Sequence, residues 1–222
     1  MRSEPPPLDG HLWGEWVRGG GARWDIVRRS WTVFMLNTQE LIRLLRRPRD
    51  DPGLALQLMN IDDPAITAPF WDELDQRLVN HINSAVTLVA HTGRLTKYFR
   101  PDFPAMVAEY DRRNAAIMAM EQATFLRDLR NYLLKYGPAP IIQTLTVSDV
   151  QMTHTLKLSA TKLLEWGEWK RAESYLRSFA DGDGPVIGDD VAAYSTEMIA
   201  LYMWLFGQRQ VVQDAPPDRL RA

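Results

Sequence analysis

The sequence contains no cysteine. Disulfide frameworks, thiolate metal sites and thiol-based catalysis are therefore excluded, because each needs the cysteine sulfur. The chain also has little excess charge of either sign, since 26 lysines and arginines stand against 28 aspartates and glutamates and leave a net charge of −2. Non-specific affinity for nucleic acid comes from an excess of basic residues, so the composition excludes a polyanion binder that works through bulk charge alone.

Long apolar runs are also lacking. The most apolar stretch, residues 191–206, contains Glu197 and is shorter than the roughly 20 residues that a membrane-spanning helix needs. Residues 1–10 are polar and rich in proline, without the apolar centre of a signal peptide. With 222 residues, 45% of them hydrophobic, we expect one soluble cytoplasmic domain that makes no contact with a membrane.

Apolar residues recur at steps of three and four through most of the chain, which is the pattern of amphipathic helices. The pattern predicts five helices, at about 22–47, 70–98, 103–136, 160–179 and from Asp189 or Asp190 to 213. Residues 54–59 are expected to form at most a short turn. We expect the second and third helices to be antiparallel, and Gly137, before Pro138, to end the third helix in a left-handed conformation.

Residues 143–158 alternate between apolar and polar side chains instead, which indicates a β-hairpin. The sequence therefore predicts an all-α bundle of about five helices with one short β-hairpin. We expect this domain to span residues 22–213, between a flexible lead segment at 1–21 and a tail at 214–222.

Two blocks of charge stand out in this nearly neutral chain. Residues 18–49 hold eight arginines against Asp25 and Glu40, and residues 50–75 hold seven acidic side chains and no basic one. One interpretation is a basic helix face that binds phosphate. The interpretation that we favour is a solvated first helix whose arginines face the acidic segment.

Polar side chains gather near the end of the third expected helix, in the segment FLRDLRNYLLKYG at residues 125–137. At about 100° per residue, Arg127, Asn131 and Lys135 share one side of the helix, and Arg130 projects beside them. Two guanidiniums, an amide and an ammonium are donors suited to a phosphate. The alternative is that cations simply favour the C-terminal end of a helix dipole, which accounts for Lys135 and in part for Arg130.

Residues 78–140 resemble the core helical hairpin of the HEPN superfamily, whose signature is an arginine, commonly followed by an asparagine, and a histidine five residues after the arginine. FLRDLRNYLLKYG is similar to the LRNY…H segments of bacterial and phage members. The preceding stretch LVNHINSAVTLVAHTGRL, residues 78–95, resembles the helix before that motif. The resemblance implies a HEPN-like helical bundle.

Mapped onto this sequence, Arg130 matches the family's arginine, Asn131 its asparagine, and Lys135 takes the position of its histidine. In active members two such motifs meet across a homodimer, with the histidine transferring protons and the arginine stabilising phosphate charge. Lysine titrates near 10.4 and histidine near 6.5, so Lys135 is poorly suited to that proton transfer. We therefore expect a homodimer that binds RNA or a nucleotide without metal or cofactor and is at best a degenerate endoribonuclease.

The histidines and a calcium-like loop are the other candidates. His81 and His91 lie on the second expected helix and could serve the Arg130 flank as binding or acid–base groups; the alternative is that they are partly buried and hydrogen-bonded. His154 is expected in the core. Residues 181–190 begin like a calcium loop, but Pro185 and Val186 occupy positions that need other residues, so no metal site is predicted.

Tryptophans point to a second hypothesis. Trp24, Trp31, Trp71 and Trp204 fit apolar stripes and are expected in the core, whereas Trp13 and Trp16 lie in the lead segment and could contact a protein partner. The alternative function is therefore a non-catalytic dimeric scaffold. An exposed Arg130 without a carboxylate partner favours the RNA hypothesis, and a buried Arg130 paired with Asp128 or Glu121 favours the scaffold.

Overall fold

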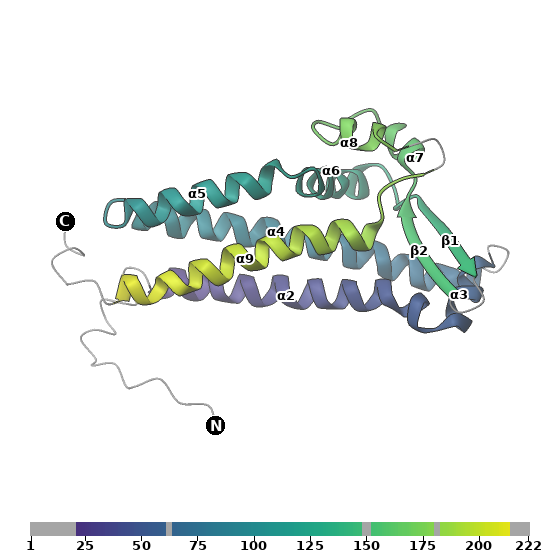
Figure 1. Ribbon diagram of the computed structural model, residues 1–222, viewed down its shortest axis with the longest axis horizontal. Helices are drawn as coiled ribbons and strands as arrows, with labels where there is room; N and C mark the ends of the chain where they lie inside the picture. Colours follow the sequence, from purple (N-terminus) through teal and green to yellow (C-terminus); the bar gives the residue numbers. More distant parts are fainter. Residues whose placement is uncertain (1–20, 61–63, 148–151, 180–182, 214–222) are drawn as a thin grey trace, which may run out of the picture.

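The long helices of the computed structural model run side by side (Figure 1). The structure describes residues 21–60, 64–147, 152–179 and 183–213. Helices α2 (Gly21–Asp50), α4 (Pro64–Phe99), α5 (Pro104–Ala119) and α9 (Ile187–Gln213) alternate in direction along the long axis. This arrangement is an antiparallel, up-down-up-down bundle, which confirms the all-α class and the antiparallel pairing of the second expected helix with the chain that follows it.

Shorter elements gather toward one end of the bundle (Figure 1). They are α3 (Pro52–Met59), α6 (Glu121–Lys135), β1 (Ile141–Val147), β2 (Met152–Leu158), α7 (Ala160–Leu164) and α8 (Glu173–Arg177). The two strands pair antiparallel, with Leu145 opposite His154, so the predicted hairpin is confirmed. The expected turn at 54–59 is a full helix, because Asp51 accepts a hydrogen bond from the Leu54 amide and Pro52 occupies the first turn.

The bundle core is built from the stripes that the sequence shows. On α2 the buried side chains recur at three- and four-residue steps and include Trp24, Val27, Phe34 and Leu41. Trp24 is buried as expected, whereas the other three expected core tryptophans pack against the core while remaining partly exposed; they are Trp31, Trp71 and Trp204. His154 is buried, as predicted, and its Nε2 lies 3.1 Å from Oε1 of Gln143. Trp13 and Trp16 lie outside the described residues.

The prediction of one helix over 103–136 is wrong. The chain leaves the helical conformation at Met120, whose ψ of 141° is extended, so that α5 and α6 are separate helices. Residues 123–126 at the start of α6 are all buried, which means that this helix is covered on more than one side. Neither proline nor glycine marks the break. Gly137 does follow the end of α6, but it does not have a positive φ.

The prediction of a single helix over 160–179 is also wrong. The chain turns at Gly167, whose φ of +67° only glycine adopts readily, and helix resumes at Glu173. Tertiary contacts hold the segment between α7 and α8. The Trp169 indole donates to the Leu163 carbonyl at 2.6 Å, and the buried Asp128 carboxylate accepts the amides of Arg171 and Ala172 at 3.1 and 3.3 Å.

Among the described residues, Arg47 of α2 pairs with Glu73 of the acidic segment at 3.5 Å. Arg28 pairs with Asp25 of its own helix. In the described part of the chain, Arg43 and Arg46 form no ion pair. The favoured interpretation of the charge blocks therefore accounts for Arg47, while much of the α2 charge faces solvent. Along the described residues, none of the helices combines the length and apolar character needed to cross a membrane.

Burial shifts the pKa values of His81 and Asp190 in opposite directions. His81 on α4 lies against Phe34 and Tyr194, and its burial lowers the pKa from 6.5 to about 4. Asp190 lies within the first turn of α9, not at the cap position predicted for it, because that helix begins at Ile187. It accepts a hydrogen bond from the Tyr175 hydroxyl at 2.8 Å, and burial raises its pKa from 3.8 to about 6.

These two pKa shifts act on stability with opposite signs. His81 folds neutral, so its contribution is lost as the pH falls from 6.5 toward 4. Asp190 favours the protonated form in the fold, so stability is instead lost as the pH rises from about 4 toward 6. We predict that Asp190→Asn removes the contribution of Asp190, so that the His81 contribution is no longer opposed. The free energy of unfolding of this variant should fall by up to about 3 kcal/mol as the pH drops from 6.5 to 4.

Denaturant unfolding at a series of pH values measures this effect. The exposed neighbour provides the control, because Asp189→Asn should leave the pH profile as it is in the unmodified protein. If the free energy of unfolding of Asp190→Asn changed with pH in parallel with that of the unmodified protein, Asp190 would not oppose the pH dependence caused by His81.

Candidate functional site

Arg130 lies in the second half of α6, on the side that packs against α4. Its Nε–H donates to Oδ1 of Asn83 on α4, and its Nη1 donates to Oδ1 of Asn131 at 3.4 Å. A guanidinium carries five N–H groups, so three remain after these two bonds. Arg130 and Asn131 are both half-buried, and no carboxylate of the described residues pairs with Arg130. Its positive charge is therefore held in place by neutral amides.

The two acidic residues that might have neutralised Arg130 lie elsewhere. Asp128 is buried and bonds to the backbone before α8. Glu121 is in the first turn of α6, nine residues and about 13 Å along the helix from Arg130. The structure therefore matches neither expected arrangement in full, since Arg130 has no carboxylate partner among the described residues but is half-buried and not exposed.

Lys135 and Arg127, the other two residues of the predicted phosphate site on this helix, lie on neighbouring surfaces. Lys135 is exposed in the last turn of α6. Arg127 is half-buried and lies toward α9: burial raises the pKa of Tyr194, and the charge of Arg127 opposes that rise. The structure therefore brings Arg130 and Asn131 into direct contact, with Lys135 one turn beyond Asn131 and Arg127 on the α9 side.

The two histidines do not join Arg130. His81 is fully buried and its Nδ1 lies 3.1 Å from the Thr38 hydroxyl, so it is a core residue and does not bind ligand at the surface. His91 is half-buried, and its Nδ1 lies 2.6 Å from the Ser30 hydroxyl. His91 follows Asn83 by eight residues, about 12 Å along α4. A group bound at Arg130 is therefore beyond its reach.

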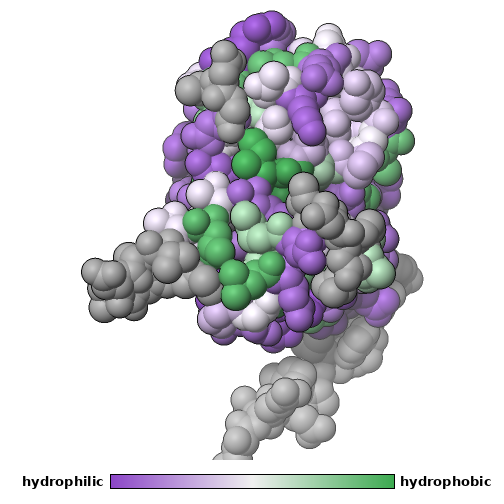
Figure 2. Space-filling view, turned by 90° about the vertical axis from the view of Figure 1, so that its right-hand side faces the viewer, coloured by the Kyte–Doolittle hydropathy of each residue, from purple (hydrophilic) through white to green (hydrophobic). Residues whose placement is uncertain are grey.

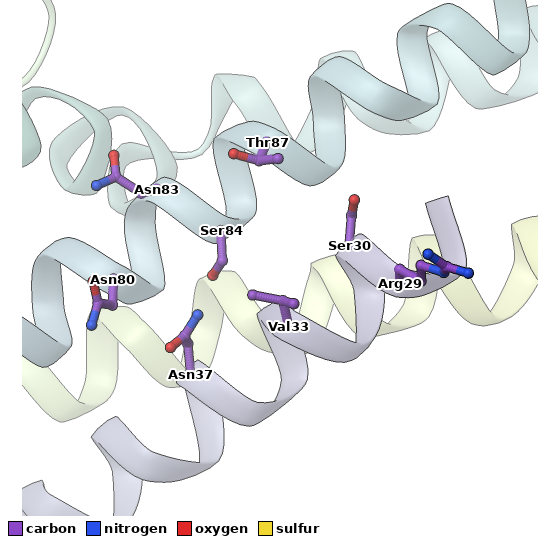
Figure 3. Close-up of a pocket in the computed structure, with 8 residues that line it drawn as sticks. All are labelled: Arg29, Ser30, Val33, Asn37, Asn80, Asn83, Ser84 and Thr87. Carbon is purple, nitrogen blue, oxygen red and sulfur yellow. The ribbon is translucent and has the colours of Figure 1, made fainter. Parts of the chain in front are cut away.

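A groove of about 370 Å³ lies between α2 and α4 (Figure 3). Asn83, one of its lining residues, also accepts the Nε–H of Arg130. From α2 the groove is lined by Arg29, Ser30, Val33 and Asn37. From α4 it is lined by Asn80, Asn83, Ser84 and Thr87. No acidic residue is among these, so the groove lining carries no negative charge, and Asn83 links it to the Arg130 guanidinium.

Asn83 is the residue that the sequence analysis missed. It joins Arg130 to the groove, yet it belongs to no family motif. A signal for it was present, because Asn80, Asn83, Ser84 and Thr87 recur at steps of three, one and three and place a run of uncharged polar side chains on one side of the helix. Such a stripe, on a helix that packs against two neighbours, indicates a polar contact between helices.

The comparisons with known proteins leave the site to be interpreted from its geometry. No family model matches the chain, and no curated protein or solved structure is significantly similar to it. Among residues 21–60, 64–147, 152–179 and 183–213, no group of three or more acidic or histidine side chains is placed to hold a metal ion. What the site offers is a fixed guanidinium with free N–H groups, neutral amides and a nearby exposed ammonium, which together suit an oxyanion.

Proposed function

We propose that this protein binds RNA or a nucleotide through phosphate contacts at Arg130, Asn131 and Lys135, with weak or lost ribonuclease activity. The observation that carries the proposal is the state of Arg130, which is half-buried, oriented by two amides and without a carboxylate partner among the described residues. An arginine paired with a carboxylate would have to break that pair before binding phosphate. Arg130 has no such pair to break, so its free N–H groups can meet the phosphate oxygens directly.

The resemblance of residues 78–140 to HEPN proteins supports the same ligand class. In that family the arginine matched by Arg130 stabilises phosphate charge, and the position taken here by Lys135 belongs to the histidine that transfers protons. The histidines of the described α4 do not substitute for it, because His81 is buried and His91 is about 12 Å along the helix from Asn83. The proposal is therefore binding without efficient turnover.

We predict that Arg130→Gln weakens the binding of a short single-stranded RNA by about 10- to 100-fold at low salt, because a charge-assisted hydrogen bond to phosphate is lost. A fluorescently labelled RNA and anisotropy measure the affinity. Arg46→Gln is the matched control, since Arg46 is an exposed arginine near the end of α2 that forms no ion pair with a described residue.

Binding should also weaken as the salt concentration rises, because phosphate contacts release counterions. Equal losses for Arg130→Gln and Arg46→Gln would mean that RNA responds only to total charge. Absence of binding at low salt would refute the proposal and favour the scaffold function.

The second prediction concerns turnover. Lys135→His places a group that titrates near neutrality one turn from Asn131, so we expect RNA cleavage to rise at least about 10-fold over the unmodified protein, with the highest rate near pH 6 to 7. Gel analysis of labelled RNA without added metal measures it. Lys135→Gln removes the charge without adding an acid–base group and should stay inactive. Rapid cleavage by the unmodified protein that survives Arg130→Gln would place the active site elsewhere.

Two exposed apolar side chains favour dimerisation at this end of α6. Leu134 and Tyr136, which flank Lys135, are 54% and 53% exposed. On the face of the molecule that carries β1, β2 and α3, apolar side chains reach the surface in several small groups between polar ones (Figure 2). A homodimer that buries Leu134 against its copy would bring two Lys135 flanks together, which is the arrangement that the HEPN resemblance implies.

We predict that Leu134→Asp converts a dimer into a monomer of about 25.5 kDa, because it places a carboxylate in the apolar contact. Sedimentation equilibrium measures the mass. Met203→Asp is the control, since Met203 is 64% exposed on α9 and lies outside the proposed contact. A monomeric unmodified protein at all concentrations would contradict the proposed assembly.

A further inference from the structure

The groove between α2 and α4 has polar side chains that nothing in the described chain satisfies. Asn37, Asn80 and Thr87 form no side-chain hydrogen bond with any described residue. In Figure 3, Asn37 and Ser84 extend from facing helices into the space between α2 and α4. Asn37 and Asn80 are both half-buried, so water reaches them only in part. A half-buried amide without a protein partner is free to bond to a ligand in place of water.

The chemistry of these side chains narrows the class of that partner. A carboxamide offers two N–H donors and one acceptor oxygen in a plane, a pattern that matches the edge of a nucleobase. The groove has no acidic side chain, and Val33 contributes an apolar wall of the kind on which a flat ring can pack. Its volume of about 370 Å³ lies in the range of small-molecule sites. A neutral, flat group with several hydrogen-bonding atoms fits these features.

The groove is also joined to the proposed phosphate site. Asn83 lines the groove and accepts the Nε–H of Arg130 through Oδ1, which leaves its own amide N–H groups without an acceptor among the described residues. A ligand with its phosphate at the free N–H groups of Arg130 therefore has its next chemical group beside Asn83. For a nucleotide, that group is the sugar and then the base.

We propose that the α2–α4 groove is the nucleoside subsite of the Arg130 phosphate site, with Asn37 and Asn80 pairing with the base. This inference rests on the proposed function, because it assumes that a phosphate binds at Arg130. It assigns selectivity for the base to residues outside the RNxxxK segment. Phosphate contacts at Arg130 position the ligand, and the amides of the groove distinguish one base from another.

The test compares ligands that share a phosphate and differ in the base. The ¹⁵N-labelled full chain is titrated with the four common ribonucleoside 5′-monophosphates, ribose 5-phosphate and inorganic phosphate, and NMR spectra report the affinities. We expect at least one nucleotide to bind about tenfold or more tightly than ribose 5-phosphate, and to shift the Asn side-chain amide signals, because paired amide contacts discriminate between bases.

Two variants locate the selectivity. Asn37→Leu and Asn80→Leu should each reduce the preference for that nucleotide over ribose 5-phosphate to within about twofold and leave the affinity for ribose 5-phosphate unchanged. Gln39→Leu is the matched control, because Gln39 is exposed on the same helix and lies about 200° around its axis from Asn37. The Asn amide shifts in the unmodified protein give a readout that does not depend on either variant folding.

The outcomes separate this inference from the proposed function. If nucleotides and ribose 5-phosphate bind equally and Arg130→Gln abolishes both, the phosphate site stands and the nucleoside subsite is wrong. If a nucleotide is preferred but the preference survives both Asn variants, the base is read elsewhere and the inference is again wrong. If none of the phosphate ligands binds, the proposed function fails together with this inference.

Discussion

The antiparallel packing of α2 against α4 is the constraint on which the rest of the structure depends. Toward the core, this pair buries Phe34 and His81 and supplies the surface against which α9 packs. Toward solvent, the same two helices carry the amide-lined groove and Asn83. Because a helix is a rigid element whose faces are fixed by its 3.6-residue period, the core stripe also determines where the polar stripe lies. The site is thus positioned by the packing of the core.

Periodicity was enough to predict the long helices and the hairpin but not the places where the chain departs from a helix. The apolar stripe continues in phase from Ile117 to Phe125, so nothing local shows the break at Met120. That break depends on burying α6 beneath Trp169 and its neighbours, which lie some 45 residues further along the chain. Gly167 did offer a local signal, since glycine is rare within helices. The turn that follows Gly167 is held by Asp128, whose carboxylate accepts the Arg171 amide from a distant part of the sequence.

The candidate site also has one part that the sequence predicts and another that only the structure shows. The Arg130 and Asn131 pair could be found from the sequence, because adjacent residues on one helix remain neighbours in any fold. Asn83 could not be paired with Arg130 without the structure, since 47 residues separate them and the register of α4 against α6 decides which side chains meet. The same register removes His81 from the site, because the position that turns Asn83 toward Arg130 turns His81 into the core.

The choice of amides as partners for Arg130 also agrees with the proposal of binding without efficient turnover. A carboxylate would fix the guanidinium more strongly but would cancel its charge, whereas the oxygens of Asn83 and Asn131 orient it and leave the charge available to an anion. Neither amide can accept or release a proton near neutral pH. On the proposed function, the Arg130 guanidinium stabilises phosphate charge, and its two amide partners in the described chain do not move a proton. An arrangement of this kind is suited to holding RNA or a nucleotide rather than to cutting it.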